Sequence, residues 1–252
     1  MISANALWKC NFTDPLSASG LALQSADPTR AQIIYGGRDG PCAVMLTTQP
    51  GDIGIAGSGA NERCDLELPS DPTYGNEGQV EWWAHSLMFP PWYVAPPGWL
   101  IPFNFHSYVS GGGQANFQIV ARATTLELWV CSGQNVVNLP TDPGFHSFSI
   151  GPRVNGVWYD FTYNVKWSSG DDGFLIAYLG GNQVMYWNGP TLYANPAGGA
   201  WPAYLKLANY HPPLTPDVPV SVIHSRIVRG ASQADVQVNK AAPYVVTSLV
   251  YA

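Results

Sequence analysis

The sequence predicts an all-β protein of 252 residues, folded as a jelly-roll sandwich of two antiparallel sheets. Three observations indicate this fold class. Short runs of alternating apolar and polar residues recur along the chain. The segments between them are turn-rich, with 26 Gly and 22 Pro in total. Neither a long helical period nor an internal repeat is visible, so we expect a single domain over residues 1–252.

The expected strands are runs rich in β-branched and aromatic residues, each bounded by Gly, Pro, Asn or Asp. In chain order they cover residues 7–12, 32–35, 42–47, 63–68, 79–89, 102–109, 116–121, 125–131, 144–150, 157–167, 174–179, 183–187, 204–210 and 220–228. The end of the chain, residues 231–252, is expected to form closing strands or a tail, with 236–238 and 244–251 as the candidate strands.

Three of the expected strands carry chemically useful side chains on one face, while their other face is apolar. The three polar faces are Arg63, Asp65 and Glu67; Asn104, His106 and Tyr108; and Tyr204, Lys206 and Tyr210. If these strands belong to one curved sheet, cations, an amide, an imidazole and phenols meet on its open face.

This set of groups matches the needs of β-elimination at a uronic acid. The substrate carboxylate must be neutralised before its C5 proton becomes acidic, which Asn104 with Arg63 or Lys206 could do. A base must take that proton, and His106 or an ionised Tyr210 is suitable. An acid must protonate the leaving O4 oxygen, a role suited to Tyr210. The scheme needs no metal ion.

The same strands resemble the signature strands of jelly-roll polysaccharide lyases, in the alginate lyase, glucuronan lyase and heparin lyase I groups. Those groups carry an R-x-E-type strand, a Q-x-H strand and a Y-x-K-x-x-x-Y strand. Here they read Arg63-Cys64-Asp65, Asn104-Phe105-His106 and Tyr204-Leu205-Lys206-Leu207-Ala208-Asn209-Tyr210, in the same order. The likeness covers roughly residues 63–230. It implies a concanavalin-like sandwich and a lyase activity.

By this resemblance, His106 and Tyr210 are base and acid, Asn104 and Arg63 bind the carboxylate, and Lys206 assists. The chain departs from the family pattern in having Asn104 in place of Gln. It also has Asp65 and Glu67 where the family more often has Glu and a second cation. Fewer cations suggest a polymer less charged than heparin, such as glucuronan or alginate.

A wider group of residues is expected to bind substrate around these five. Its members are Asp65, Glu67, Tyr108, Tyr204, His211 and Trp201. His211 follows Tyr210 and is placed at the rim of the site, while Trp201 belongs to a Pro/Gly-rich loop and suits stacking on a sugar ring. Arg63 can equally be interpreted as the partner of Asp65 or Glu67 in a same-face ion pair.

Other functions remain open at this point. A non-catalytic carbohydrate-binding or lectin-like module would keep the aromatic residues but would not need His106 with Tyr210. A glycoside hydrolase on the same fold would use paired carboxylates, for which Asp65 and Glu67 have a possible spacing. A phage tail or capsid decoration is a further alternative.

Composition limits the partners. Net charge is -6 and the chain has no basic run, so nucleic acid is not an expected partner. It has no apolar run long enough to cross a membrane and no signal-peptide pattern, so we expect a secreted monomer whose signal is absent from this sequence, or a phage-associated protein. Four cysteines without a C-x-x-C motif argue against zinc. No cofactor is expected; a structural calcium ion is possible, although no ligand motif supports it.

Overall fold

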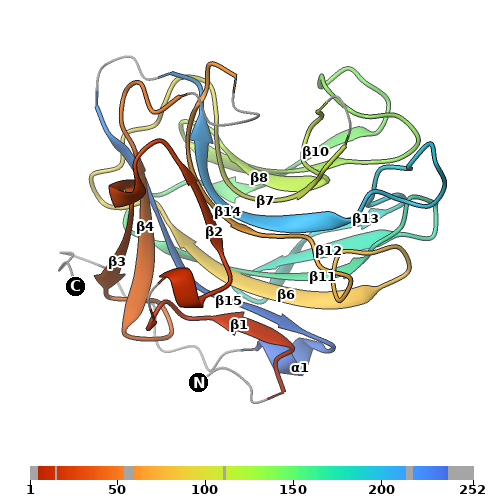
Figure 1. Cartoon of the computed structure of the whole chain (residues 1–252), viewed down its shortest axis with the longest axis horizontal. Coiled ribbons are helices and arrows are strands. Elements are labelled where there is room, and N and C mark those ends of the chain that lie inside the picture. Colours follow the sequence, from red (N-terminus) through yellow and green to blue (C-terminus); the bar gives the residue numbers. More distant parts are fainter. Residues whose placement is uncertain (1–4, 15, 54–58, 110–111, 214–217, 238–252) are drawn as a thin grey trace.

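The computed structural model describes residues 5–14, 16–53, 59–109, 112–213 and 218–237. Two antiparallel sheets pack face to face (Figure 1). The sheet that carries the predicted site, here called the concave sheet, curves so that its open side faces upward in Figure 1. In spatial order it contains β10 (Phe145–Pro152), β9 (Thr125–Cys131), β8 (Phe117–Ala121), β7 (Leu100–Ser107), β14 (Ala203–His211), β5 (Glu62–Leu68) and β2 (Ala22–Ser25).

The second sheet, here called the convex sheet, lies beneath it. Its order is β13 (Asn182–Asn188), β12 (Phe174–Leu179), β11 (Trp158–Lys166), β6 (Val80–Met88), β15 (Val220–Gly230), β4 (Cys42–Thr48) and β3 (Ala31–Tyr35), with β1 (Trp8–Cys10) also paired to β15. Two 3₁₀ turns, η1 (Leu16–Ala18) and η2 (Pro28–Arg30), and one short helix, α1 (Gln233–Val236), complete the described elements. None of these helices has the length and apolar character needed to span a membrane.

The expected all-β sandwich is confirmed, and every expected strand before residue 229 is present. Two features differ from the sequence prediction. Strand β2 was missed because its four residues show no clear alternation. The expected strand at 236–238 is wrong over its described part, because Ser232 and Asp235 form a capping box that starts α1. The other candidate strand, 244–251, lies outside the described residues.

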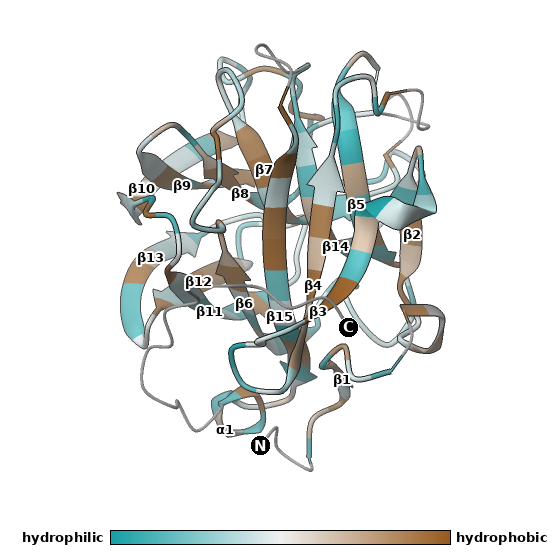
Figure 2. Ribbon diagram, turned by 90° about the vertical axis from the view of Figure 1, so that its left-hand side faces the viewer, coloured by the Kyte–Doolittle hydropathy of each residue, from teal (hydrophilic) through white to brown (hydrophobic). Residues whose placement is uncertain are grey.

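The core between the sheets is built from the apolar face of each strand, and Figure 2 shows hydrophobic and hydrophilic residues alternating along these strands. Beneath the concave sheet, Phe105 packs against Trp83, Phe117 and Trp167, with ring centroids 5.0, 4.8 and 5.2 Å away. Such an aromatic core fixes the floor of the concave sheet, because large rings that interdigitate leave little freedom for a strand to shift.

All four cysteines are buried free thiols: Cys10, Cys42, Cys64 and Cys131. Burial raises the pKa of Cys64 and of Cys131 to about 12, so both remain protonated at neutral pH. The sequence left disulfide bonds possible, and the structure forms none among these residues.

His85 and His224 lie in the core, away from the concave face. The imidazole of His85 stacks on the ring of Phe103, with 3.8 Å between the ring centroids, and it is fully buried. His224 is also fully buried, with Nε2 3.3 Å from the carbonyl of Ala208. Burial lowers the pKa of His85 well below its usual range and that of His224 to about 4, so both rings are neutral in the folded protein.

We predict that the protein loses stability as the pH falls from about 6.5 towards about 4. In this window the unfolded chain protonates both histidines while the folded chain does not, so protons favour unfolding. For His224 alone the shift corresponds to about 3 kcal/mol. Urea unfolding at a series of pH values measures the slope. A His85→Phe variant should show a shallower slope than the wild type above about pH 5, and an unchanged slope would contradict the prediction.

Candidate active site

Strand β14 lies between β5 and β7, so the three polar strands predicted from sequence do share one sheet. The antiparallel register pairs Lys206 with both Glu67 and Asn104. It also pairs Tyr210 with Arg63 and Tyr204 with His106. Residues directly opposite each other on one face have Cβ atoms about 5 Å apart. The expected meeting of cations, amide, imidazole and phenols on one face is therefore found.

Alternation along the strands explains why these side chains point out of the core. Leu205, Leu207, Phe103 and Phe105 are fully buried between the sheets, so the residues between them occupy the opposite, concave face. Loops at both ends of these strands rise above the concave sheet in Figure 1. The polar residues of β5, β7 and β14 on this concave face are here called the floor.

The two cations of this floor each lie beside a carboxylate. Arg63 Nε is 3.1 Å from Asp65 Oδ2, so the same-face ion pair considered from sequence is present. Lys206 Nζ is 3.4 Å from Glu67 Oε2 and donates to the Gln24 side chain of β2 at 2.7 Å. Burial raises the pKa of Asp65, against the opposing effect of both cations, and burial lowers the pKa of Lys206.

His106 is held in one tautomer by its own strand. Its Nδ1 lies 2.7 Å from the carbonyl oxygen of Ser107. Because a carbonyl can only accept, Nδ1 carries the proton and donates it, and Nε2 of the neutral ring keeps a lone pair. Burial lowers the pKa of His106 to about 4, helped by the charges of Lys206 and Arg63. At neutral pH, His106 is therefore an acceptor of protons.

Tyr204 lies next to His106 but is covered. Its ring centroid is 5.6 Å from that of His106, and the ring of Tyr108 stacks on its other side at 4.1 Å. The Tyr108 hydroxyl reaches across β14 and donates to Glu67. As a result Tyr204 is 4% exposed, whereas Tyr108 is 53% exposed. Tyr108 is thus the outermost phenol at this end of the floor.

Tyr210 occupies the opposite end of the floor and is partly exposed. Its hydroxyl accepts a hydrogen bond of 2.7 Å from Asn61 Nδ2. The guanidinium of Arg63 lies 4.3 Å above the ring centre, and the ring of Trp99 is 5.2 Å away. Sequence reasoning did not identify Asn61, because it precedes the strand that carries Arg63 and belongs to no alternating pattern.

The register separates His106 from Tyr210, the expected base and acid, along the strand direction. His106 pairs with Tyr204, and Tyr210 follows six positions later on β14, which corresponds to about 20 Å between the backbones. The two side chains stand on opposite sides of Lys206. They can act on one sugar only if that sugar lies between them, over the middle of the floor.

His211 does not belong to the substrate-binding group. It is fully buried, with Nε2 2.6 Å from Thr48 Oγ1 and Nδ1 2.7 Å from the carbonyl of Pro212. The reason is alternation, since His211 follows Tyr210 and its side chain faces the interior. Trp201 is partly buried and packs against the buried cluster of Cys131, Val137 and Tyr193.

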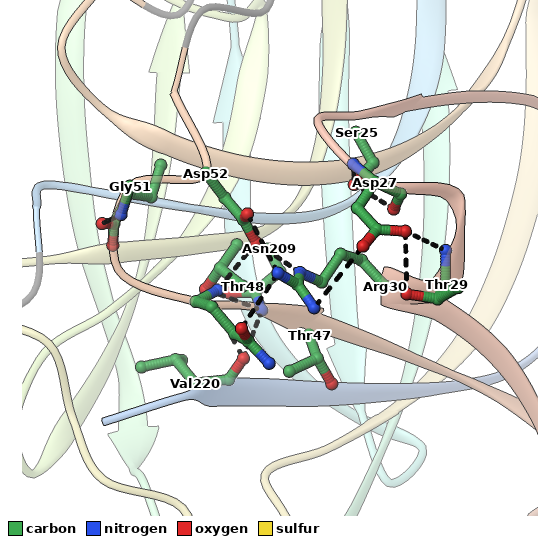
Figure 3. Close-up of polar contacts among 12 residues, drawn as sticks. Ser25, Asp27, Thr29, Arg30, Thr47, Thr48, Gly51, Asp52, Asn209 and Val220 are labelled. Atoms are coloured by element: carbon green, nitrogen blue, oxygen red, sulfur yellow. Dashed lines mark hydrogen bonds and ion pairs between the residues drawn. The ribbon is translucent and has the colours of Figure 1, made fainter. Parts of the chain in front are cut away.

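A network of polar side chains that includes Asn209 anchors the end of β14 (Figure 3). Asn209 Nδ2 donates to the carbonyls of Leu46 at 3.0 Å and Val220 at 2.8 Å, which ties β14 to both β4 and β15. Beside it, Arg30 Nε donates to Asp52 Oδ2 at 2.7 Å. The network joins the two sheets at the edge where the floor ends.

Within the described ranges, no group of three or more His, Cys, Asp or Glu side chains is arranged to hold a metal ion. The floor combines two cations paired with carboxylates, an amide, a neutral imidazole and three phenols. Together they can neutralise a carboxylate, accept one proton and donate another.

The curved β-sandwich with this polar concave face has the jelly-roll architecture expected from the sequence. The family model described as "Polysaccharide lyase" matches residues 19–228, and the chain belongs to this family. It is therefore a polysaccharide lyase. No curated protein matches the sequence.

Solved structures with the same fold are distant in sequence. The endo-β-1,4-glucuronan lyase of the fungus Trichoderma reesei is 13% identical with a TM-score of 0.70, covering 94% of this chain and 100% of its own. Alginate lyase A1-II', of polysaccharide lyase family 7, is 17% identical with a TM-score of 0.54, covering 78% and 82%. A carbohydrate esterase of the Shiga toxin-encoding bacteriophage phi24B is 14% identical with a TM-score of 0.56, covering 89% and 97%.

We predict that Asn209→Ala lowers the free energy of unfolding by about 2–3 kcal/mol, because two buried carbonyls lose their donor. Urea unfolding followed by tryptophan fluorescence measures the change. Asn188→Ala, at an exposed position on β13, is the matched control and should stay within about 0.5 kcal/mol of the wild type. Equal stability of the two variants would argue against the anchoring role.

Proposed function

We propose that the protein cleaves a uronic-acid polysaccharide by β-elimination, leaving an unsaturated uronate at the new chain end. The observation that carries this proposal is the placement of one neutral imidazole and one partly exposed phenol on opposite sides of a buried lysine. His106 and Tyr210 are those two groups, and Lys206 is the lysine between them. A sugar ring over Lys206 would be within reach of a base and an acid at once.

Carboxylate neutralisation comes first in the proposed mechanism. Lys206 and Asn104 lie directly opposite each other on adjacent strands, and Arg63 approaches from the side of Tyr210. A substrate carboxylate bound by these donors withdraws electron density from C5 and makes the C5 proton more acidic. The partly buried environment strengthens each of these hydrogen bonds.

The elimination step then needs two proton transfers. Nε2 of His106 accepts the C5 proton, and the electrons of the C5–H bond form the C4=C5 double bond. The C4–O4 bond breaks, and its electrons go to the leaving oxygen, which takes a proton from the Tyr210 hydroxyl. Because that hydroxyl accepts its hydrogen bond from Asn61, its own proton is available for donation.

Tyr210 suits the acid role better than Tyr204. Tyr204 is almost completely buried beneath Tyr108, and burial raises its pKa. We assign Tyr204 to the support of His106, whose ring it contacts. Tyr108 and Glu67, with Asp65, line the floor and bind hydroxyl groups of the substrate or hold the cations in place.

The substrate class follows from the way the floor balances its charges. Arg63 and Lys206 each lie beside a carboxylate, so the floor offers little surplus positive charge. We therefore propose a polymer that carries carboxylates without sulfate groups, such as glucuronan or alginate. The fold similarity to a glucuronan lyase and an alginate lyase supports this choice. We also propose that the protein acts as a monomer, either outside the cell that produces it or on a phage particle.

Hydrolysis by the same floor is less well supported. A glycoside hydrolase needs one carboxyl group free to give a proton and another free to attack or activate water. Asp65 and Glu67 are the nearest candidates, but both form ion pairs with Arg63 or Lys206. A binding module without catalysis would leave the neutral His106 and the donor-ready Tyr210 without a role.

Incubation with glucuronan, alginate, hyaluronan, heparin, pectate and ulvan, followed in the near ultraviolet, is the direct test of this function. We expect absorbance to rise with an unsulfated uronan. Tyr210→Phe should lower kcat by about a hundredfold to ten-thousandfold, because the leaving oxygen loses its proton donor. Tyr204→Phe is the matched control and should retain most of the activity. No rise with any polymer, or near-normal turnover by Tyr210→Phe, would overturn the assignment.

The pH dependence of kcat/KM provides a second test. His106 must be unprotonated to act as the base, and its pKa is about 4. We predict that kcat/KM stays near its maximum down to about pH 5 and declines around pH 4 as Nε2 takes up a proton. Activity regained on return to neutral pH separates this effect from unfolding. An acidic limb centred near 6.5, the ordinary pKa of histidine, would contradict the role of His106.

A further inference from the structure

A row of side chains crosses the concave sheet beyond the proposed catalytic groups. From Lys206 on β14 the register leads to Asn104 on β7, then to Gln118 on β8 and to Trp129 on β9. Adjacent strands are about 4.8 Å apart, so Trp129 lies about 14 Å from Lys206 across the sheet. A polysaccharide that crosses the strands over Lys206 would therefore pass over this row.

Arg122 lies beside the far end of the row and is fixed by three neighbours. Its Nε and one terminal nitrogen lie 3.3 and 3.5 Å from the carboxylate oxygens of Glu127, and its other terminal nitrogen donates to the carbonyl of Gly98 at 3.1 Å. Its guanidinium carbon lies 5.4 Å from the ring centre of Trp129, whose Nε1 donates to the same Glu127 at 2.8 Å.

The contacts that hold the Arg122 guanidinium in place do not occupy all of its N–H donors. The side chain of Arg122 remains 34% exposed. A guanidinium has five N–H donors, and the three contacts made within the described chain leave two of them for a ligand. Glu127 and Trp129 alternate with core residues of β9, so they place Arg122 on the same concave face as Lys206.

Two neighbouring residues, Gly98 and Trp99, link Arg122 to Tyr210, the proposed acid. Gly98, which accepts from Arg122, is followed by Trp99, whose ring packs against Tyr210 at 5.2 Å. Arg122 is nevertheless two strands away from β14 and four residues beyond Gln118, just past the end of β8, which places its backbone about 16 Å from that of Lys206. Its charge therefore has no role in the elimination itself.

We propose that Arg122, positioned by Glu127 and Trp129, binds the carboxylate of a sugar residue a few positions away from the bond that is cleaved. The inference rests on the proposed function, since it takes the ligand to be the same uronate polymer. An arginine that presents two parallel N–H groups matches a carboxylate, and Trp129 adds apolar surface for the sugar ring. Binding would thereby depend on chain length.

Binding of oligoglucuronates and oligoalginates of graded length tests the inference. Titration calorimetry on a Tyr210→Phe background avoids turnover. In this background we expect affinity to increase with chain length until the oligomer reaches Arg122. Adding Arg122→Gln should lower the affinity for the long oligomers about tenfold and leave the shortest ones unchanged. Lys166→Gln, which removes an ion-paired cation from β11 of the convex sheet, should change neither.

The outcomes separate this inference from the proposed chemistry. Arg122→Gln binding oligomers of every length as tightly as its parent would overturn the subsite, even if the near-ultraviolet assay shows elimination. A selective loss of affinity for long oligomers would support the subsite, even if no unsaturated product is found. Arg122→Lys keeps the charge without the planar fork and should lose part of the affinity; it carries the test if Arg122→Gln proves unfolded by thermal melting.

Discussion

The fixed position of β14 between β5 and β7 is the constraint on which the site depends. Its inward residues are locked by the core, through Leu205 and Leu207, and by the hydrogen bonds of Asn209 to the other sheet. A strand has only two faces, so this locking also decides where Lys206 and Tyr210 point. The packing of the aromatic core therefore also fixes the positions of the polar side chains on the floor.

Burial and charge act against each other on this floor. Taking Lys206 and Asp65 out of water disfavours their charged forms, and their mutual attraction offsets part of that cost. No carboxylate of the described residues pairs with His106, so burial and the nearby cations keep it neutral. Burial in the same part of the sheet therefore leaves Lys206 and Asp65 as an ion pair and His106 as a neutral proton acceptor on the neighbouring strand.

Period-two patterning was sufficient to predict the sandwich, most of its strands and the face on which each polar residue lies. It could not supply the pairing register, because alternation is unchanged when one strand slides by two residues along another. The separation of His106 from Tyr210 was hidden for this reason. Arg122 and Trp129 were missed for the same reason, since their positions relative to Lys206 depend on the register of the strands that lie between them. His211 was assigned to the rim although alternation already directed it inward.

The pairing of each floor cation with a carboxylate has a consequence for how the protein meets its polymer. The field of a matched pair decays faster with distance than that of a single charge, so little long-range attraction extends beyond the floor. Proteins that neutralise a polyanion with excess cations release its condensed counterions and weaken steeply as ionic strength rises. Because Arg63, Lys206 and Arg122 are each compensated locally, we expect binding of the proposed polymer to weaken only slightly as ionic strength rises.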